Sequence, residues 1–208
     1  MKQSLSTGLL INYVYNQLCS FFPDTDSSVW KVLNRSMKET LERTFHCFSH
    51  INDKYFDRFD HLHGDQYAMF LYFLSNTIKV PDVSKRLYLL NKCLHGIDIF
   101  YEVKLPDIFL LVHPVGTVLG RAEYSDYFLV YHNCSVGSNK NIFPTIGKYF
   151  TMHPGSMFLG SCVVQEYCSL GAKALLIDSN LDKCLVYKGM PHYSTVGYGG
   201  NMPGGKWK

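Results

Sequence analysis

Hydrophobic residues follow two different spacings along this 208-residue chain. Up to about residue 95 they recur every three or four positions, which is typical of amphipathic helices. One such run follows Asp26, a good capping residue, and another follows Pro81–Asp82, which opens a third helix after a nearly all-apolar segment at 67–74. The pattern predicts an all-helical domain over residues 1–96. We interpret the aromatic residues between its helices as core packing: Phe45, Phe48, Tyr55, Phe56 and Phe59.

From about residue 97 the period changes to six. Two series of apolar residues, each with a step of six, run through this half. The first comprises Val118, Tyr124, Val130, Val136 and Ile142, and the second Ile146, Met152, Phe158, Val164, Leu170 and Leu176. The residue two places before each member is small in most turns, as at Gly116, Ala122, Cys134, Ser156, Cys162, Cys168 and Ala174.

A six-residue period with one aliphatic and one small residue pointing inward predicts short strands joined by corners. Three such units make one triangular coil of a parallel β-helix. Cys134, Cys162 and Cys168 then fill the narrow inner slot as compact hydrophobic residues, not as nucleophiles or metal ligands. The fold class is therefore α+β: a helical domain over 1–96, a left-handed parallel β-helix over 97–197 and a Gly-rich tail, expected to be mobile, over 198–208. The four-residue step between Ile142 and Ile146 predicts a loop around 138–144.

Composition narrows the function classes. The net charge of +3 comes from 20 Lys and Arg against 17 Asp and Glu, which gives no reason to expect nucleic-acid binding. No apolar run is long enough to span a membrane, and the N-terminal stretch lacks a secretory cleavage pattern. Seven cysteines without a Cys-x-x-Cys pair favour reduced thiols, and together these features predict a cytoplasmic protein.

The residues at the start of the repeats bear a resemblance to a known family. Asp98-Ile99 is followed, fifteen residues after Asp98, by a run from His113 to Gly120 that reads His-Pro-Val-Gly-Thr-Val-Leu-Gly. This run resembles the His-Ala-Thr-Gly-(Ile/Val)-Val-(Ile/Val)-Gly motif of serine acetyltransferases, which an Asp-Ile pair precedes at the same spacing. The resemblance to this branch of the hexapeptide-repeat acyltransferases extends over about residues 60–197.

The resemblance implies transfer of an acetyl group from acetyl-CoA to a hydroxyl, with no metal. His113 takes the place of the general base and Asp98 that of the carboxylate that orients it. A hydroxyl needs such a base near neutral pH, and a carboxylate on the other ring nitrogen fixes the tautomer. His132 is a rival base, because Tyr131–Gly137 resembles the His-Asp-Cys run of sugar acyltransferases; it is otherwise an exterior coil residue. For His113 the alternative is an ordinary turn residue before proline.

Coenzyme-binding positions also follow from the resemblance. In the family a groove along the outside of the coils, between neighbouring subunits, holds the coenzyme. The matching positions here are Pro154, Gly155, Gly171, Ala172, Lys173, Gly189 and Pro191, with Lys173 available for phosphate. For the glycines, the alternative is plain corner geometry. We expect a homotrimer, with a dimer of trimers as the alternative, because sites in this superfamily are shared between subunits.

Two departures from the family concern the acceptor. Val112 and Phe143 stand where serine acetyltransferases carry an Asp and a His that grip serine. Replacing charge with apolar surface disfavours a zwitterion. We therefore expect a saccharide or nucleotide-sugar hydroxyl as acceptor, with serine O-acetylation as the alternative. A hypothesis of another class is a β-helix that has lost catalysis and serves as a scaffold.

Overall fold

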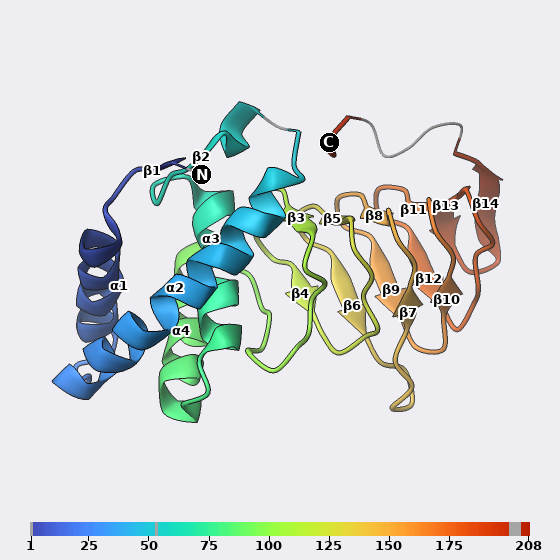
Figure 1. Ribbon diagram of the computed structural model, residues 1–208. Coiled ribbons are helices and arrows are strands. Elements are labelled where there is room, and N and C mark those ends of the chain that lie inside the picture. The colour runs from blue at the N-terminus through green and yellow to red at the C-terminus, as the bar shows by residue number, and fades with distance from the viewer. Residues whose placement is uncertain (1, 53, 200–204) are drawn as a thin grey trace.

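The computed structural model describes residues 2–52, 54–199 and 205–208 (Figure 1). Four helices form the N-terminal part: α1 (Thr7–Phe21), α2 (Ser27–Ser49), α3 (Gly64–Thr77) and α4 (Pro81–His95). A 3-10 turn, η1 (Lys54–Phe56), and a small parallel pair, β1 (Lys2–Gln3) with β2 (Arg58–Phe59), complete it. The helices stand side by side at one end of the molecule, and the coils extend away from them (Figure 1).

Local sequence explains where the helices begin and end. Asp26 caps α2, because its carboxylate accepts the Ser28 N–H. Residues 66–75 of α3 are all buried, as its nearly all-apolar sequence predicts. Pro81 opens α4, and Gly96 ends it in the left-handed conformation at φ 62°. The predicted helical domain is therefore observed, and its last helix ends one residue before the predicted boundary.

The C-terminal part is a parallel β-helix with three faces. One face carries β3 (Phe109–Leu111), β5 (Phe128–Val130), β8 (Thr151–Met152), β11 (Ser169–Leu170) and β13 (Leu185–Met190). A second carries β4 (Val118–Leu119), β6 (Ser135–Gly137), β9 (Met157–Leu159) and β12 (Leu175–Ile177). The third carries β7 (Thr145–Ile146) and β10 (Val163–Val164). The last strand, β14 (Tyr193–Tyr198), turns back antiparallel to β13.

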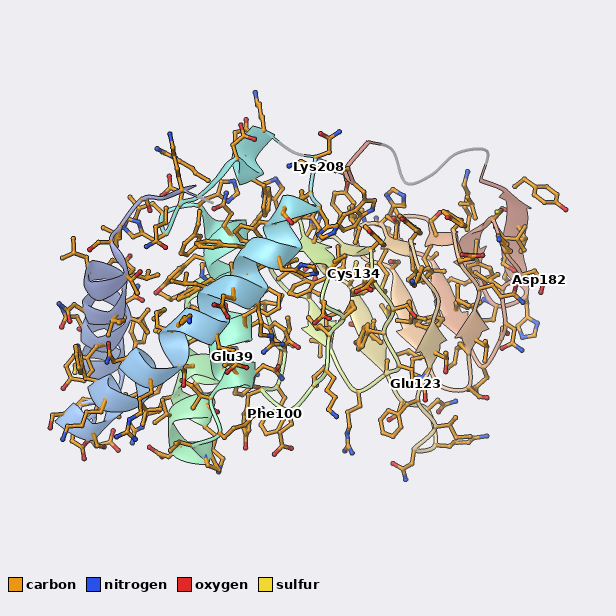
Figure 2. All side chains as sticks on the ribbon, viewed as in Figure 1. Glu39, Phe100, Glu123, Cys134, Asp182 and Lys208 are labelled. Carbon is orange, nitrogen blue, oxygen red and sulfur yellow. The ribbon has the colours of Figure 1, made fainter. Side chains whose placement is uncertain are left out.

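The second hydrophobic series is confirmed at every position. All six of its residues, from Ile146 to Leu176, are at most 1% exposed. The predicted small inner slot is confirmed in four of the later positions, because Ser156, Cys162, Cys168 and Ala174 are buried, and Cys134 is buried as well. Figure 2 labels Cys134 within the coils. All seven cysteines are free, and burial raises the pKa of the Cys162 and Cys168 thiols.

The first series is wrong at its two ends. Val118 and Ile142 are 44% and 50% exposed, and the inward residue of the first coil is Leu119 instead. The cause is a change of register. Met152 pairs with Leu170, eighteen residues later, whereas Leu119 pairs with Val136 after only seventeen. Val130 pairs with Met152 after twenty-two, because the predicted loop around 138–144 adds residues at a corner.

Left-handed residues recur from coil to coil at the corners of the prism. At one corner these are Gly116, Asn133, Gly155 and Lys173, each two places before a strand of the second face. At another they are Tyr127, Tyr149 and Tyr167, whose rings stack at 4.2 and 4.8 Å with nearly parallel planes. A side chain other than glycine in this region is uncommon, so the repeat indicates that coil geometry imposes it.

The two parts share one hydrophobic core, which runs from α1 to the last coils. The described end of the chain also joins them. The Asn52 N–H donates to the Lys206 carbonyl at 2.7 Å, and the Trp207 ring meets Tyr127 edge-on at 5.4 Å. Residues 200–204 of the predicted mobile tail lie outside the described residues. No helix in the described ranges is long and apolar enough to cross a membrane.

Candidate functional site

His113 lies at the corner where the chain leaves β3 and turns toward β4. Its backbone is left-handed, with φ 49°, and its side chain is 79% exposed. The first turn of α3 reaches this corner, where Asp65 accepts the His113 backbone N–H at 3.1 Å. The other Asp65 oxygen lies 3.7 Å from the ring Nδ1 of His113. The carboxylate thus faces Nδ1, and Nε2 is the nitrogen directed away from it.

A pocket of about 340 Å³ surrounds this pair, between the helical part and the first coil. Half-buried Val112 and buried Leu110 form its apolar floor. Asp65 and Lys206 bring opposite charges into it. Aromatic side chains from the segment after α2 close it, namely Tyr55, Phe56 and His63. The pocket therefore offers a base, both signs of charge and ring faces within one small volume.

Within the described chain, Asp98 and His113 do not form the expected pair, because each has another partner. The two Asp98 carboxylate oxygens accept hydrogen bonds from α4, one from the Tyr88 hydroxyl at 2.8 Å and one from Lys92 Nζ at 2.6 Å. Burial alone raises the pKa of Asp98, but these two hydrogen bonds outweigh it and lower that pKa overall. The physical reason is strand geometry: Asp98 bridges Val118 in mid-face and points outward to α4, whereas His113 lies at the preceding corner.

The other two histidines of this corner have different surroundings. The His132 carbonyl accepts the Gly155 N–H at 3.0 Å, which ties its backbone into the coil ladder. The His153 ring stacks on Tyr131 at 5.7 Å, and burial lowers its pKa. Within the described residues neither ring has a carboxylate within 4 Å, so His113 is the histidine of this corner that a carboxylate accompanies.

The residues expected to hold the coenzyme gather along the same corner as His113. Gly155 and Lys173 are consecutive members of the left-handed row that begins at Gly116. The Lys173 N–H donates to the Pro154 carbonyl at 2.9 Å, and Gly171 bonds to Tyr187 of the last coil. A Cβ added at Gly171 would lie 3.0 Å from Lys188, so the backbone approaches closely there. Gly189 and Pro191 lie at the hairpin between β13 and β14.

The two expected acceptor residues are not brought together in this chain. Val112 lines the His113 pocket, but Phe143 lines a separate cavity of about 600 Å³ with Glu123 and Arg121. The Arg121 guanidinium lies 5.2 Å from the Phe143 ring centre. In Figure 2, Lys208 lies at the upper edge of the molecule, whereas Glu123 and Phe100 lie at the lower edge. Within one chain, Val112 and Phe143 therefore line two separate cavities, and a shared acceptor pocket stays a prediction.

The sequence alone did not identify Asp65, Lys206 or Tyr55 as pocket residues. Asp65 reads as an ordinary first-turn acid of a helix, and Tyr55 as core, although it is 57% exposed. The Gly-rich surroundings of Lys206 gave no signal at all. Across the described ranges, no group of three or more His, Cys, Asp or Glu side chains is placed to hold a metal ion.

Solved structures with the same fold include several serine acetyltransferases. The enzyme from Neisseria gonorrhoeae superposes with a TM-score of 0.77 over 97% of this chain and 83% of its own, at 15% sequence identity. The enzyme from Vibrio cholerae gives 0.71 over 90% and 78%, at 14% identity. A serine acetyltransferase solved in complex with CoA gives 0.72 over 92% and 84%, also at 14%.

These structures confirm the predicted fold, a helical domain followed by a left-handed β-helix. No protein-family model and no curated protein sequence matches the chain. The likeness to these three structures is thus one of architecture, at 14–15% sequence identity.

Proposed function

We propose that this protein is an acetyl-CoA-dependent O-acetyltransferase with His113 as its general base. The observation that carries the proposal is the exposed His113 ring with Asp65 on its Nδ1 side, inside a pocket at the start of the β-helix. A carboxylate in that position favours the tautomer with the proton on Nδ1 and stabilises the imidazolium. Nε2 is then free to accept a proton from a hydroxyl.

The reaction follows from these positions. His113 Nε2 removes the proton of the acceptor hydroxyl as its oxygen bonds to the thioester carbon of acetyl-CoA. Collapse of the tetrahedral intermediate breaks the carbon–sulfur bond, and the protonated His113 returns its proton to the departing CoA sulfur. The products are an acetyl ester and free CoA. Backbone N–H groups of the corner are suitable donors for the oxyanion of the intermediate.

Acetyl-CoA would bind along the corner of the β-helix that runs from His113 to the last coil. Gly155, Gly171 and Ala172 leave little side-chain bulk along it, and Lys173 adds an exposed cation for a phosphate group. Gly189 and Pro191 extend the row to the hairpin. A serine acetyltransferase solved in complex with CoA is among the structural neighbours, which supports acetyl-CoA as the substrate.

A serine-type amino acid is the acceptor that the pocket and the neighbours favour. Part of the charge that Val112 and Phe143 lack is supplied from elsewhere, because Lys206 lines the pocket and suits a carboxylate. One neighbour is a serine acetyltransferase in complex with cysteine, an amino acid of similar shape. A saccharide hydroxyl is the second candidate, on the ground that Tyr55 and Phe56 line the pocket with ring faces.

The test is release of free CoA with acetyl-CoA and single acceptors: L-serine, simple sugars and nucleotide sugars. Turnover of serine that greatly exceeds that of every saccharide supports the first candidate, and the reverse order supports the second. No turnover with any acceptor would leave the non-catalytic scaffold. We also propose a cytoplasmic homotrimer, with a dimer of trimers as the alternative assembly. A stable, fully active monomer in light scattering would contradict the trimer.

A further inference from the structure

A second cavity, of about 540 Å³, lies in the helical part and shares no residue with the His113 pocket. Its walls come from α2, α3, the start of α4 and the segment 101–105 that leads toward the first coil. Figure 2 labels Phe100, which immediately precedes that segment, at the lower edge of the helices. Ile78, Pro81 and Leu105 give the cavity an apolar side. Its volume is that of a typical small-molecule site.

Arg43 is held rigidly in this cavity by neutral groups. Its Nη1 donates to the Thr77 hydroxyl at 2.7 Å and its Nη2 to the Asn76 side-chain oxygen at 3.0 Å. The guanidinium also lies 5.1 Å from the Phe73 ring centre, which fixes its plane. A guanidinium has five N–H donors, so three remain for another partner. Within the described residues no carboxylate lies within ion-pair distance of this half-buried cation.

Two lysines add to the positive charge around Arg43. Lys79 and Lys104 both line the cavity, and Lys79 Nζ donates only to the Asn76 carbonyl at 3.1 Å among the described contacts. The acidic residue of the lining is Glu102, which hydrogen-bonds to the neighbouring Tyr101 and forms no ion pair with these cations in the described structure. Three cations and one carboxylate leave an excess of two positive charges beside an apolar wall.

We propose that this cavity binds a small phosphate monoester. A phosphate monoester carries about −1.5 to −2 charges near neutral pH, which matches the excess of the lining. The rigid Arg43 fork suits bidentate bonds to phosphate oxygens, with Lys79 and Lys104 as further cations. The carbon part of the ligand would lie against Ile78, Pro81 and Leu105. This site is distinct from the acetyl-transfer site, and the proposal stands whether or not the proposed activity is correct.

Isothermal titration calorimetry with phenyl phosphate tests the site. Because CoA itself carries phosphate groups, the titration is run on the full chain at low salt with CoA at saturating concentration. We expect one site per chain, affinity that falls as salt rises, and no binding of neutral phenol. Arg43→Met should weaken phenyl phosphate binding about 10- to 100-fold, because it removes charge-assisted hydrogen bonds. Lys85→Met, an exposed lysine of α4 outside the cavity, is the matched control and should leave it unchanged.

Lys104→Met is a second test variant, used in case Arg43→Met does not fold. We expect it to fold, because Lys104 is exposed and has no described hydrogen bond. It should weaken binding severalfold while the circular dichroism spectrum stays that of the parent protein. The proposal is overturned if phenyl phosphate does not bind when CoA saturates its own site. Equal affinity for the parent and for folded Arg43→Met and Lys104→Met variants would also overturn it.

Discussion

The first coil of the β-helix and its later coils obey the same geometry with different regularity. Between β7 and β12, strand partners lie eighteen residues apart, and every inward position is filled by a buried aliphatic, aromatic or small residue. In the first coil the spacing varies, from nineteen residues between β3 and β5 to seventeen between β4 and β6. Leu119 replaces Val118 inside, and His113 lies at an exposed corner beside α3. The regular repeat produces the buried core, whereas His113 lies in the coil where the regular spacing is interrupted.

The contrast extends to what holds each region. The later coils are stabilised by burial of residues such as Phe158 against their neighbours along the axis. The first coil depends on contacts with another part of the chain, since Asp65 of α3 binds the His113 backbone and Gly116 donates to the Gly96 carbonyl. A change in a later coil should therefore affect stability first, and a change at the first corner should affect activity first.

The largest expected effect is on activity. His113→Ala removes the base and should lower kcat by about two to four orders of magnitude, with an unchanged circular dichroism spectrum. His132→Ala is the matched control, because His132 lies at the same corner one coil further along without a carboxylate beside it. The measurement is CoA release under saturating acetyl-CoA. If His132→Ala abolished turnover and His113→Ala kept it, the base would be His132.

The next effect is on stability. Phe158→Ala removes a fully buried ring from a regular coil and should lower the free energy of unfolding by about 3–5 kcal/mol. Ile142→Ala, in the exposed loop, should change it by no more than about 0.5 kcal/mol. Denaturant unfolding measures both. Equal losses would show that the loop packs as a coil does.

A smaller effect separates the two carboxylates. Asp65→Asn should lower kcat about tenfold, a loss of about 1.4 kcal/mol of transition-state stabilisation, because it weakens support for the imidazolium. Asp98→Asn should leave kcat nearly unchanged and weaken only the contact with Lys92 on α4. The kcat values of the two purified variants decide this. A larger loss of kcat from Asp98→Asn than from Asp65→Asn would show that Asp98, as the family motif suggests, is the carboxylate that supports His113.

The smallest effect concerns pH and the helical part. Burial lowers the pKa of His95 to about 4, so the folded state keeps it neutral while the unfolded state protonates it near pH 6.5. This contribution to stability is complete above pH 6.5 and is lost as pH falls from 6.5 toward 4. His95→Gln should reduce that slope by at least about 1 kcal/mol over the interval, whereas His192→Gln, on the exposed hairpin, should not. Unfolding curves at pH 7, 5.5 and 4.5 test it.

Sequence periodicity predicted the regular coils because every inward residue there meets the same environment. Ile146 to Leu176 could be placed without a structure for that reason. Val118 and Ile142 could not, since a one-residue change of register and a corner insertion alter which side of the strand faces inward. The pairing of Asp98 with His113 is not observed within one chain, because a spacing of fifteen residues does not specify which corner each side chain reaches. The sequence could not predict the contact of Asp65 with His113, because the two residues lie 48 positions apart.

The number of coils fixes the length of the edge along which one row of left-handed corner residues lies. This row comprises Gly116, Asn133, Gly155 and Lys173. Neighbouring strands lie about 4.8 Å apart, so the three steps between Gly116 and Lys173 amount to about 14 Å. Whole coils, and not individual side chains, set this length. Deleting or duplicating one eighteen-residue coil would shorten or lengthen it by a single strand spacing, while each remaining coil kept its own internal packing. The length of edge available to a long ligand would therefore change in steps of one strand spacing.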